Sequence, residues 1–306
     1  MSLSPRKMAQ VAQIGLERAR ADAFIFAHHY QRAEIKGLAD AVGGSRDLWR
    51  AVLNMERAAV VVCGVDFMAE TARRLRPDIN VLVPREDALC PYAQRVGARE
   101  LLAARGARPA RLIAAETKAS AAVKEMADLL LDPEEEAPLR VARGAAPLLA
   151  LPSYRLYRDG AVADAAPPGA PRCQIHAQIS LEETREAQRR YPGALLAVNS
   201  LCLPSVRESA DFSGDSAALW EYCAARAERE IILVAESGLR ESLLEKFPGS
   251  ALREVETEMF CPNMKLTNIK DVLRVLEACP SPAQGNLGAV SWGAPGESLP
   301  EGGAVF

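Results

Sequence analysis

Short apolar runs rich in β-branched residues alternate along the chain with longer stretches of Ala, Glu and Arg. Uninterrupted apolar runs are typical of strands buried on both faces of a parallel sheet, and amphipathic stretches between them are typical of crossover helices. The pattern therefore predicts an α/β fold. The expected strands are Ala23–Phe26, Ala59–Cys63, Asn80–Pro84, Arg111–Ala115, Pro147–Leu151, Ala194–Val198 and Glu230–Ala235.

Two stretches lack any periodicity. Asp159–Pro171 and the segment that starts at Pro280 are crowded with Gly and Pro, with Ser as well in the latter. Such composition is typical of irregular structure. We expect a loop at the first position and a tail at the second.

Composition limits the classes of function. A chain of 306 residues that is 49% hydrophobic can bury a large core, as one domain or as two to three small ones. The net charge of -3, with both signs interspersed, gives no basic face, so we expect no nucleic-acid partner. No run of about 18 apolar residues and no secretory leader is seen, so we expect no membrane span and a cytoplasmic protein.

The cysteines carry the candidate chemistry. Their odd number, seven, argues against a secreted disulfide framework, and none lies in a CxxC pair that would indicate a zinc ribbon or a ferredoxin-type cluster. Three of them, Cys90, Cys173 and Cys261, recur at intervals of about 85 residues, which weakly indicates a threefold repeat that brings three thiols together.

Two of these thiols precede a proline. Proline is favoured at the first position of a helix, so Cys90 and Cys261 are expected at helix N-termini, where the helix dipole lowers a thiol pKa and favours the thiolate that iron binds. An isolated cysteine is more often a small buried hydrophobe, so on spacing alone both readings stay open.

Several motifs resemble those of one enzyme family, in that family's order. They are AHHYQ (27–31), CGVDFMAETA (63–72), PDINVLVPREDALCPYA around Cys90, CQIH (173–176), ADFSGDSA (210–217), ILVAESGL (232–239) and FCPNMK (260–265). From about Ala21 to about Glu277 the chain resembles the quinolinate synthases. The resemblance implies three α/β/α sandwich units with parallel sheets around a pseudo-threefold axis, with the active site at their junction. The expected boundaries are 1–91 with 262–306, then 92–174, then 175–261.

The resemblance also implies a cofactor. In that family one cysteine from each unit binds a 4Fe-4S cluster, and the matching positions here are Cys90, Cys173 and Cys261. One iron then has no protein ligand and can act as a Lewis acid on a small carboxylated substrate. We expect the remaining four thiols to be structural: Cys63, Cys202, Cys223 and Cys279.

By the same resemblance, His28 and Ser45 hold a substrate carboxylate, and Tyr30 takes part in proton transfer or positioning. Asn199 and Ser216 are further candidates for substrate binding. Without the family, a tyrosine at a strand end is more often a packed residue. His176, beside a predicted cluster ligand, is expected to support the site or to be structural.

The chain departs from the family at four places. The family's Tyr-x-Asn is Ala114-Ala115-Glu116, its His-Pro-Glu is Asn199-Ser200-Leu201, its Thr-Ser-Ser stretch is Leu129–Glu135, and a usual Thr is Ser216. Quinolinate synthases condense iminoaspartate with dihydroxyacetone phosphate, and these anions need donors that the chain has lost, while Glu116 adds negative charge. Glu116 is the new residue that we expect to be catalytic; a solvated acid at a strand end is the alternative.

Three hypotheses follow. The first is a cluster-dependent enzyme, a monomer or homodimer, that condenses or dehydrates a small carboxylated substrate with altered specificity; quinolinate formation itself is its conservative version. The second is a non-catalytic protein that keeps the cluster for structure or sensing. A nucleotide-binding α/β protein is the weakest, since no GxGxxG or GxxxxGK[ST] follows a predicted strand.

Overall fold

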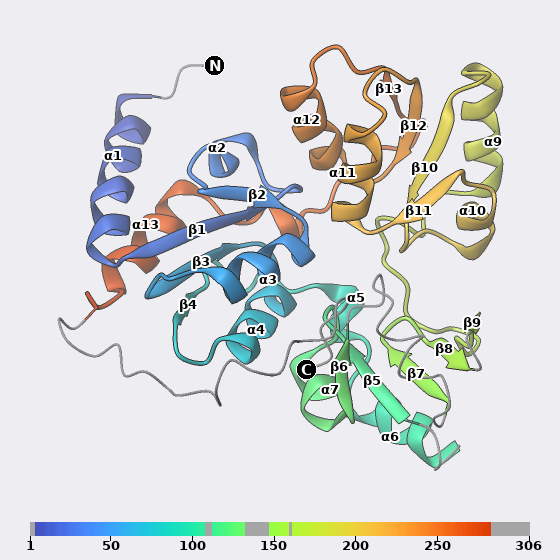
Figure 1. Ribbon diagram of the computed structural model, residues 1–306, viewed down its shortest axis with the longest axis horizontal. Coiled ribbons are helices and arrows are strands. Elements are labelled where there is room, and N and C mark those ends of the chain that lie inside the picture. The colour runs from blue at the N-terminus through green and yellow to red at the C-terminus, as the bar shows by residue number, and fades with distance from the viewer. Residues whose placement is uncertain (1–3, 108–111, 132–146, 159–160, 283–306) are drawn as a thin grey trace, which may run out of the picture. The chain divides into compact units, whose positions relative to one another are not determined.

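The computed structural model describes residues 4–107, 112–131, 147–158 and 161–282. The chain divides into two compact units, here called lobes: lobe 1 combines the chain up to Cys90 with Arg172–Pro280, and lobe 2 contains Pro91–Pro171. Figure 1 labels the elements along the chain, and each lobe is described by itself.

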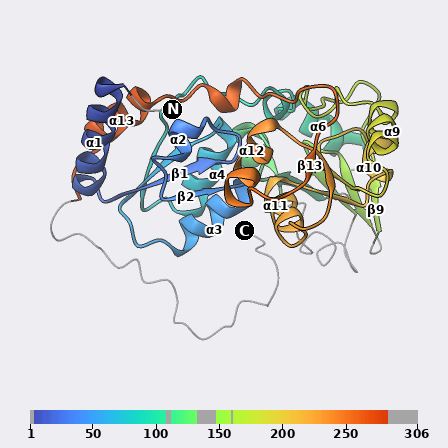
Figure 2. The same ribbon diagram turned by 90° about the horizontal axis from the view of Figure 1, so that it is seen from above.

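The first sheet of lobe 1 is parallel, with strand order β2-β1-β3-β4. Its strands are β1 (Ala23–His28), β2 (Ala41–Gly43), β3 (Ala59–Cys63) and β4 (Asn80–Leu82). Its helices are α1 (Pro5–Arg20), α2 (Ala33–Lys36), α3 (Ser45–Asn54), α4 (Asp66–Leu75) and α13 (Ile269–Ala278). Helices α1 and α13, far apart in sequence, lie side by side (Figures 1 and 2). Every residue of β3 is buried, as expected for an inner parallel strand.

The second sheet of lobe 1 repeats this topology, with the parallel order β11-β10-β12-β13. Its strands are β10 (Leu195–Asn199), β11 (Phe212–Gly214), β12 (Ile231–Val234) and β13 (Leu252–Arg253). Its helices are α9 (Leu181–Arg190), α10 (Pro204–Glu208), α11 (Ser216–Ala224) and α12 (Ser237–Lys246), followed by the 3₁₀ turn η1 (Asn263–Lys265). An apolar core that includes Ile179, Leu196 and Ile232 lies under it.

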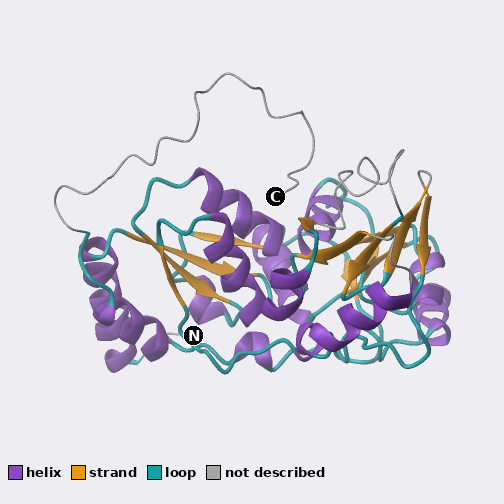
Figure 3. Ribbon diagram, turned by 90° about the horizontal axis from the view of Figure 1, so that it is seen from below, coloured by secondary structure: helices purple, strands orange, loops and turns teal. Residues whose placement is uncertain are grey.

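Lobe 2 has one mixed sheet of order β6-β5-β7-β8-β9. Its strands are β5 (Leu112–Glu116), β6 (Leu129–Leu131), β7 (Leu148–Leu151), β8 (Arg155–Arg158) and β9 (Ala161–Asp164). The first three are parallel and the last two form an antiparallel meander. Its helices are α5 (Pro91–Gln94), α6 (Ala98–Ala107) and α7 (Ala121–Met126). Figure 3 distinguishes the strands of the three sheets from the surrounding helices.

One contact recurs in all three sheets. An aspartate accepts a hydrogen bond of 2.8 Å from the backbone N–H of a residue 15 positions earlier, in the strand that begins the parallel part of the sheet. The pairs are Ile25 with Asp40, Ile113 with Asp128, and Leu196 with Asp211. The same local construction is therefore used three times along the chain.

The predicted α/β class is confirmed, and the ends of each of the seven expected strands agree with the structure to within two residues. The loop expected at Asp159–Pro171 is wrong for Ala161–Asp164, which pairs with β8 to form β9. Residues 159–160, and the expected tail beyond residue 282, lie outside the described residues. The pseudo-threefold axis and the three-unit boundaries stay predictions. Within the described ranges, no helix has both the length and the apolar character that crossing a bilayer requires.

Candidate active site

The end of β1 forms a tight turn that presents two side chains. After the last strand residue, His28, the backbone N–H of His29 donates to Gly43 O at 3.0 Å, and that of Gln31 donates to His28 O at 2.9 Å. Between them, the Tyr30 N–H donates to Nδ1 of His28 at 3.1 Å. The ring of Tyr30 meets that of His28 edge-on, with centroids 4.4 Å apart.

The end of β10 makes the same turn. Ser200 N donates to Gly214 O at 2.8 Å, Cys202 N donates to Asn199 O at 2.9 Å, and Leu201 N donates to Oδ1 of Asn199 at 3.0 Å. Asn199 thus stands where His28 stands in the first sheet, and Leu201 stands where Tyr30 does.

In lobe 2 the end of β5 has the corresponding backbone contacts. Thr117 N donates to Leu131 O at 3.0 Å, and Ala119 N donates to Glu116 O at 2.8 Å. Glu116 is therefore the third residue of this kind. Its side chain is only 1% exposed and accepts a hydrogen bond from Ser153 Oγ, so the alternative of a solvated acid is wrong.

His28 has a defined tautomer. Because Nδ1 accepts a backbone N–H, the proton of the neutral ring resides on Nε2. Nε2 lies 3.3 Å from Oγ of Ser216, and both side chains are buried. The ring therefore supplies a hydrogen-bond donor without carrying a charge.

Two helix N-termini meet beside this histidine. Helix α3 begins at Ser45 and α11 at Ser216. A Cβ added to Gly44 would lie 2.7 Å from Ser216 Oγ and 2.9 Å from Ala217 N, so only glycine permits this approach. The largely buried ion pair of Arg46 with Asp215, at 2.8 Å, joins the two helix starts. Backbone N–H groups and both helix dipoles favour an anion here.

Tyr30 contacts the second sheet of the lobe. Nδ2 of Asn199 donates to the Tyr30 hydroxyl at 3.3 Å, in the amide orientation that the Leu201 contact fixes. Burial raises the pKa of Tyr30 well above its usual value, and the charges of Glu236 and Cys173 raise it further. The phenol is thus protonated near neutral pH and can donate a proton or a hydrogen bond.

The seven cysteines fall into two groups. The three predicted ligands, Cys90, Cys173 and Cys261, are half-buried, and the other four are buried. Burial raises the pKa of three of these four to about 12: Cys63, Cys202 and Cys223. Buried thiols of this kind are inert. Exposure therefore separates the three expected ligands from the other four cysteines, and the ligand assignment stays a prediction.

The three half-buried cysteines belong to segments that converge within lobe 1. Burial raises the pKa of Cys261, and negative charge on Cys173 adds to this shift. Burial likewise raises the pKa of Tyr30, with smaller contributions from Glu236, Cys173 and Cys261. Asn263 Nδ2 donates to Leu89 O at 2.7 Å, which joins the segment after Cys261 to the residue before Cys90. Nδ1 of His176 lies 3.3 Å from the Cys173 sulfur.

The described residues include no group of three or more His, Cys, Asp or Glu side chains that could hold a single metal ion. A cluster differs from a single ion, because each cysteine binds a different iron and the thiolates lie further apart. Three half-buried thiols on converging segments fit such a donor set, and the cluster stays a proposal.

A helix begins directly after only one of the two cysteines that precede a proline. Cys90 precedes α5, whose first residue is Pro91, as expected. At Cys261 the helical turn is 3₁₀ and begins at Asn263, with Pro262 as its N-cap. Burial raises the pKa of Cys261 despite the backbone N–H groups of Met264 and Asn263, so the lowered pKa expected there is wrong.

Sequence reasoning missed a buried ion pair beside these residues. Lys265 donates to Oε1 of Glu236 and, at 2.6 Å, to the backbone oxygen of Tyr30. Glu236 has no exposed surface. Both residues lie in motifs that resemble the family, and the available signal was a glutamate directly after the apolar run 231–235.

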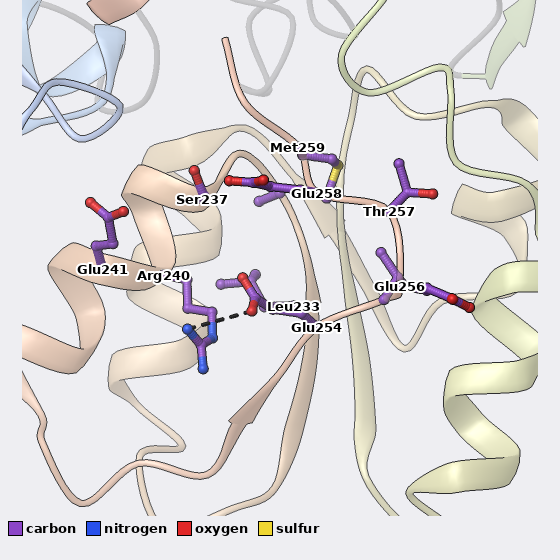
Figure 4. A pocket seen from close by; sticks show the side chains of 11 residues that line it. Leu233, Ser237, Arg240, Glu241, Glu254, Glu256, Thr257, Glu258 and Met259 are labelled. Atoms are coloured by element: carbon purple, nitrogen blue, oxygen red, sulfur yellow. Dashed lines mark ion pairs between the residues drawn. The ribbon is translucent and has the colours of Figure 1, made fainter.

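A cavity of about 350 Å³ lies between the first half of α12 and the segment 254–259, which follows β13 (Figure 4). Its charged lining consists of Arg240, 3.5 Å from Glu254, with Glu241, Glu256 and Glu258. Four carboxylates against one guanidinium repel an anionic substrate. None of the predicted site residues lines it, so we do not place a carboxylated substrate there.

Comparison with known proteins identifies the family of the chain. A family model described as "Quinolinate synthetase A protein" matches residues 12–283. Quinolinate synthases of Methanoregula boonei (257 residues, 83% of this chain and 85% of that protein) and Clostridium kluyveri (272 residues, 87% and 88%) are each 31% identical to it. So is that of Thermodesulfovibrio yellowstonii, over 273 residues covering 86% and 88%.

The fold and these matches define an α/β enzyme of NAD biosynthesis. The chain belongs to the quinolinate synthase family.

Proposed function

We propose that the chain is a 4Fe-4S enzyme of the quinolinate synthase type that condenses or dehydrates a small carboxylated substrate, with a specificity changed from that of its relatives. The observation that carries this proposal is the cysteine pattern: the three thiols that match the family's ligands are half-buried on converging segments, and the other four are buried. When bound, the cluster would supply a Lewis-acidic iron without a protein ligand.

The chain's own residues supply binding and proton transfer. The two helix starts, with Ser45 and Ser216, suit a substrate carboxylate, and neutral His28 adds a donor through Nε2. Tyr30, protonated and bonded to Asn199, can donate a proton to a developing oxyanion or orient the substrate.

The altered specificity rests on the strand ends. Glu116, where the family has an asparagine, is buried and bonded to Ser153, and Asn199 and Leu201 replace a histidine and a glutamate. The family resemblance assigns Glu116 to the substrate site, and a carboxylate in that role would disfavour a second anionic group on the substrate. The retained His28 and Tyr30, together with the names of the relatives, favour the second candidate, formation of quinolinate itself.

The cluster is tested by anaerobic reconstitution with iron and sulfide, followed by iron analysis and Mössbauer spectroscopy. We expect four irons per chain in the wild type, as in any 4Fe-4S protein. The cluster should be lost in Cys90→Ala, Cys173→Ala and Cys261→Ala. Cys202→Ala, which removes a buried thiol, is the matched control and should keep the iron. A wild type that takes up no iron would overturn the proposal.

Substrate specificity is tested by complementing a strain that lacks quinolinate synthase. We expect no growth with the wild-type chain and at least partial growth with Glu116→Asn combined with Asn199→His and Leu201→Glu, which restore the family residues. Growth with the wild type would establish the second candidate. Soluble, iron-loaded protein must be shown in each strain.

The non-catalytic alternative makes a different prediction. A cluster kept only for structure would not respond to small dicarboxylates. We expect one iron site in the Mössbauer spectrum to shift when dicarboxylate is added, and the shift to vanish in His28→Ala. An unchanged spectrum at saturating dicarboxylate would favour the scaffold.

A further inference from the structure

Two of the proposed cluster ligands share one kind of backbone contact. The N–H of Cys90 donates to Oδ1 of Asp66 at 2.7 Å, and the N–H of Cys261 donates to Oε1 of Glu236 at 3.1 Å. The carboxylates precede their cysteines by 24 and 25 residues. Each stands where a strand passes into a helix, Asp66 as the first residue of α4 and Glu236 as the N-cap of α12.

A second hydrogen bond joins each cysteine-bearing loop to the same helix start. Asp66 N donates to Ala88 O at 2.9 Å, and Ser237 N donates to Met259 O at 2.8 Å. In both cases the acceptor lies two positions before the cysteine. Each cysteine loop is therefore bound to a helix start by one backbone and one side-chain hydrogen bond, which fixes both its position and its direction.

At Cys261 the contacts extend further, through a pair of residues, Glu236 and Lys265, here called the Glu236 arm. The second oxygen of Glu236 accepts the N–H of Gly238 at 2.7 Å, and its first oxygen pairs with Lys265. Lys265 in turn donates to the backbone oxygen of Tyr30 at 2.6 Å. One buried ion pair thus connects the backbone of a cluster ligand to that of the proposed proton donor.

Close packing reinforces this connection. A Cβ added to Gly238 would lie 2.8 Å from His29 O and 2.8 Å from Tyr30 Cα, so the start of α12 lies directly against the strand-end turn. Replacing a buried ion pair by apolar side chains of similar size is often neutral for stability. The ion pair of Glu236 with Lys265 is therefore better explained by the positioning of Cys261 and Tyr30 than by a contribution to stability.

We propose that Asp66 and Glu236 are positioning residues for Cys90 and Cys261, and that Lys265 extends the Glu236 arm to Tyr30. The proposal rests on the cluster proposed above. Groups that orient metal ligands without touching the metal commonly change metal affinity ten- to a hundredfold when they are removed.

The test compares two double variants. Glu236→Leu with Lys265→Met removes the whole arm without leaving a buried charge, and Glu236→Gln with Lys265→Met removes the charges but keeps an acceptor for the Cys261 N–H. Asp66→Ala and Asp66→Asn form the same pair at Cys90. Asp211→Asn is the control, because Asp211 accepts the backbone N–H of Leu196, a strand residue of the same lobe, rather than that of a cysteine.

Two rates are measured: iron release to a chelator from reconstituted protein, and alkylation of each cysteine in iron-free protein by mass spectrometry. We expect the Leu/Met variant to release iron about ten- to a hundredfold faster than the wild type. Its Cys261 should be alkylated faster while Cys173 is unchanged, and its thermal unfolding should stay close to that of the wild type. The Gln/Met variant and Asp211→Asn should match the wild type in both rates.

The proposal is overturned if the Leu/Met variant behaves as the wild type, or if Gln/Met releases iron and alkylates as fast as Leu/Met. If even the wild type binds no iron, the cluster proposal fails, and alkylation of Cys261 relative to Cys173 still decides the positioning role. If the Leu/Met variant does not fold, the two Asp66 variants decide it at Cys90.

Discussion

The two sheets of lobe 1 have one backbone design and two sets of side chains. Their strand orders correspond, Asp40 and Asp211 make the same strand contact, and both inner strands end in the same turn. The first turn carries His28 and Tyr30, and the second carries Asn199 and Leu201. The difference shows that the backbone at these positions is fixed by topology, whereas the chemistry is set by one or two residues on each turn.

The sharpest way to break the comparison is to remove the equivalent side chains in turn. We expect His28→Ala to weaken the binding of a small dicarboxylate by about 1.5–3 kcal/mol, or roughly ten- to a hundredfold, because a donor to a charged group is lost. Calorimetric titration measures this. Asn199→Ala should lose less, since its amide contacts Tyr30. Equal losses would mean that the two turns share the work of binding.

The close approach of the two helix starts gives the next effect. Gly44→Ala places a methyl group against Ser216 and Ala217, so we expect unfolding in urea to show a loss of about 1–3 kcal/mol, together with weaker dicarboxylate binding. Gly15 in α1 has no neighbour within 4 Å, and Gly15→Ala should stabilise by up to about 1 kcal/mol. Similar stabilities of the two variants would contradict the close contact between Gly44 and the start of α11.

The shared aspartates offer a test of equivalence. Asp40→Ala and Asp211→Ala each leave a strand N–H without its acceptor, which we expect to cost about 1–3 kcal/mol of unfolding free energy in both cases. The exposed ion pair of Asp40 with Arg18 adds little. Iron content should not change. A large loss at only one position would show that the two sheets depend on this contact differently.

The last test concerns pH. Burial lowers the pKa of His29 from 6.5 to about 3, so below pH 6.5 the unfolded chain takes up a proton that the folded chain does not. Stability should fall with decreasing pH between about 6.5 and 3, by at most about 1.4 kcal/mol per pH unit from this group. His29→Phe keeps the stacking on Trp220 and should flatten the slope in urea titrations. Ser200→Ala, at the equivalent place, should leave it unchanged.

The strands differ in whether the sequence predicted them. The inner strands β1, β3, β10 and β12 were predicted, because strands buried on both faces must be apolar throughout. The edge strands β2, β11 and β13 were missed, because two or three residues carry no periodic signal. The equally short β4 was predicted because it begins a longer apolar run. Their pairing depends on the neighbouring strand rather than on their own composition.

The site divides in the same way. His28, Tyr30 and the three cysteines were predicted from motifs that resemble a family. The ion pair of Glu236 with Lys265 was not, because it depends on burial and on a contact across 29 residues. A sequence shows that two residues are charged, but it does not show that both are buried and in contact with each other.

The recurring strand-end turn has a consequence for how such a protein changes over evolutionary time. Since the backbone N–H groups and oxygens around His28, Glu116 and Asn199 are bonded to one another in each turn, the main chain there depends little on which side chain is present. If these positions contact the substrate as proposed, substitution there changes the chemistry presented to it while the backbone of each turn is preserved. For protein engineering, a combinatorial library that varies only these three positions is small, and we expect most of its members to remain folded and to differ mainly in what they bind.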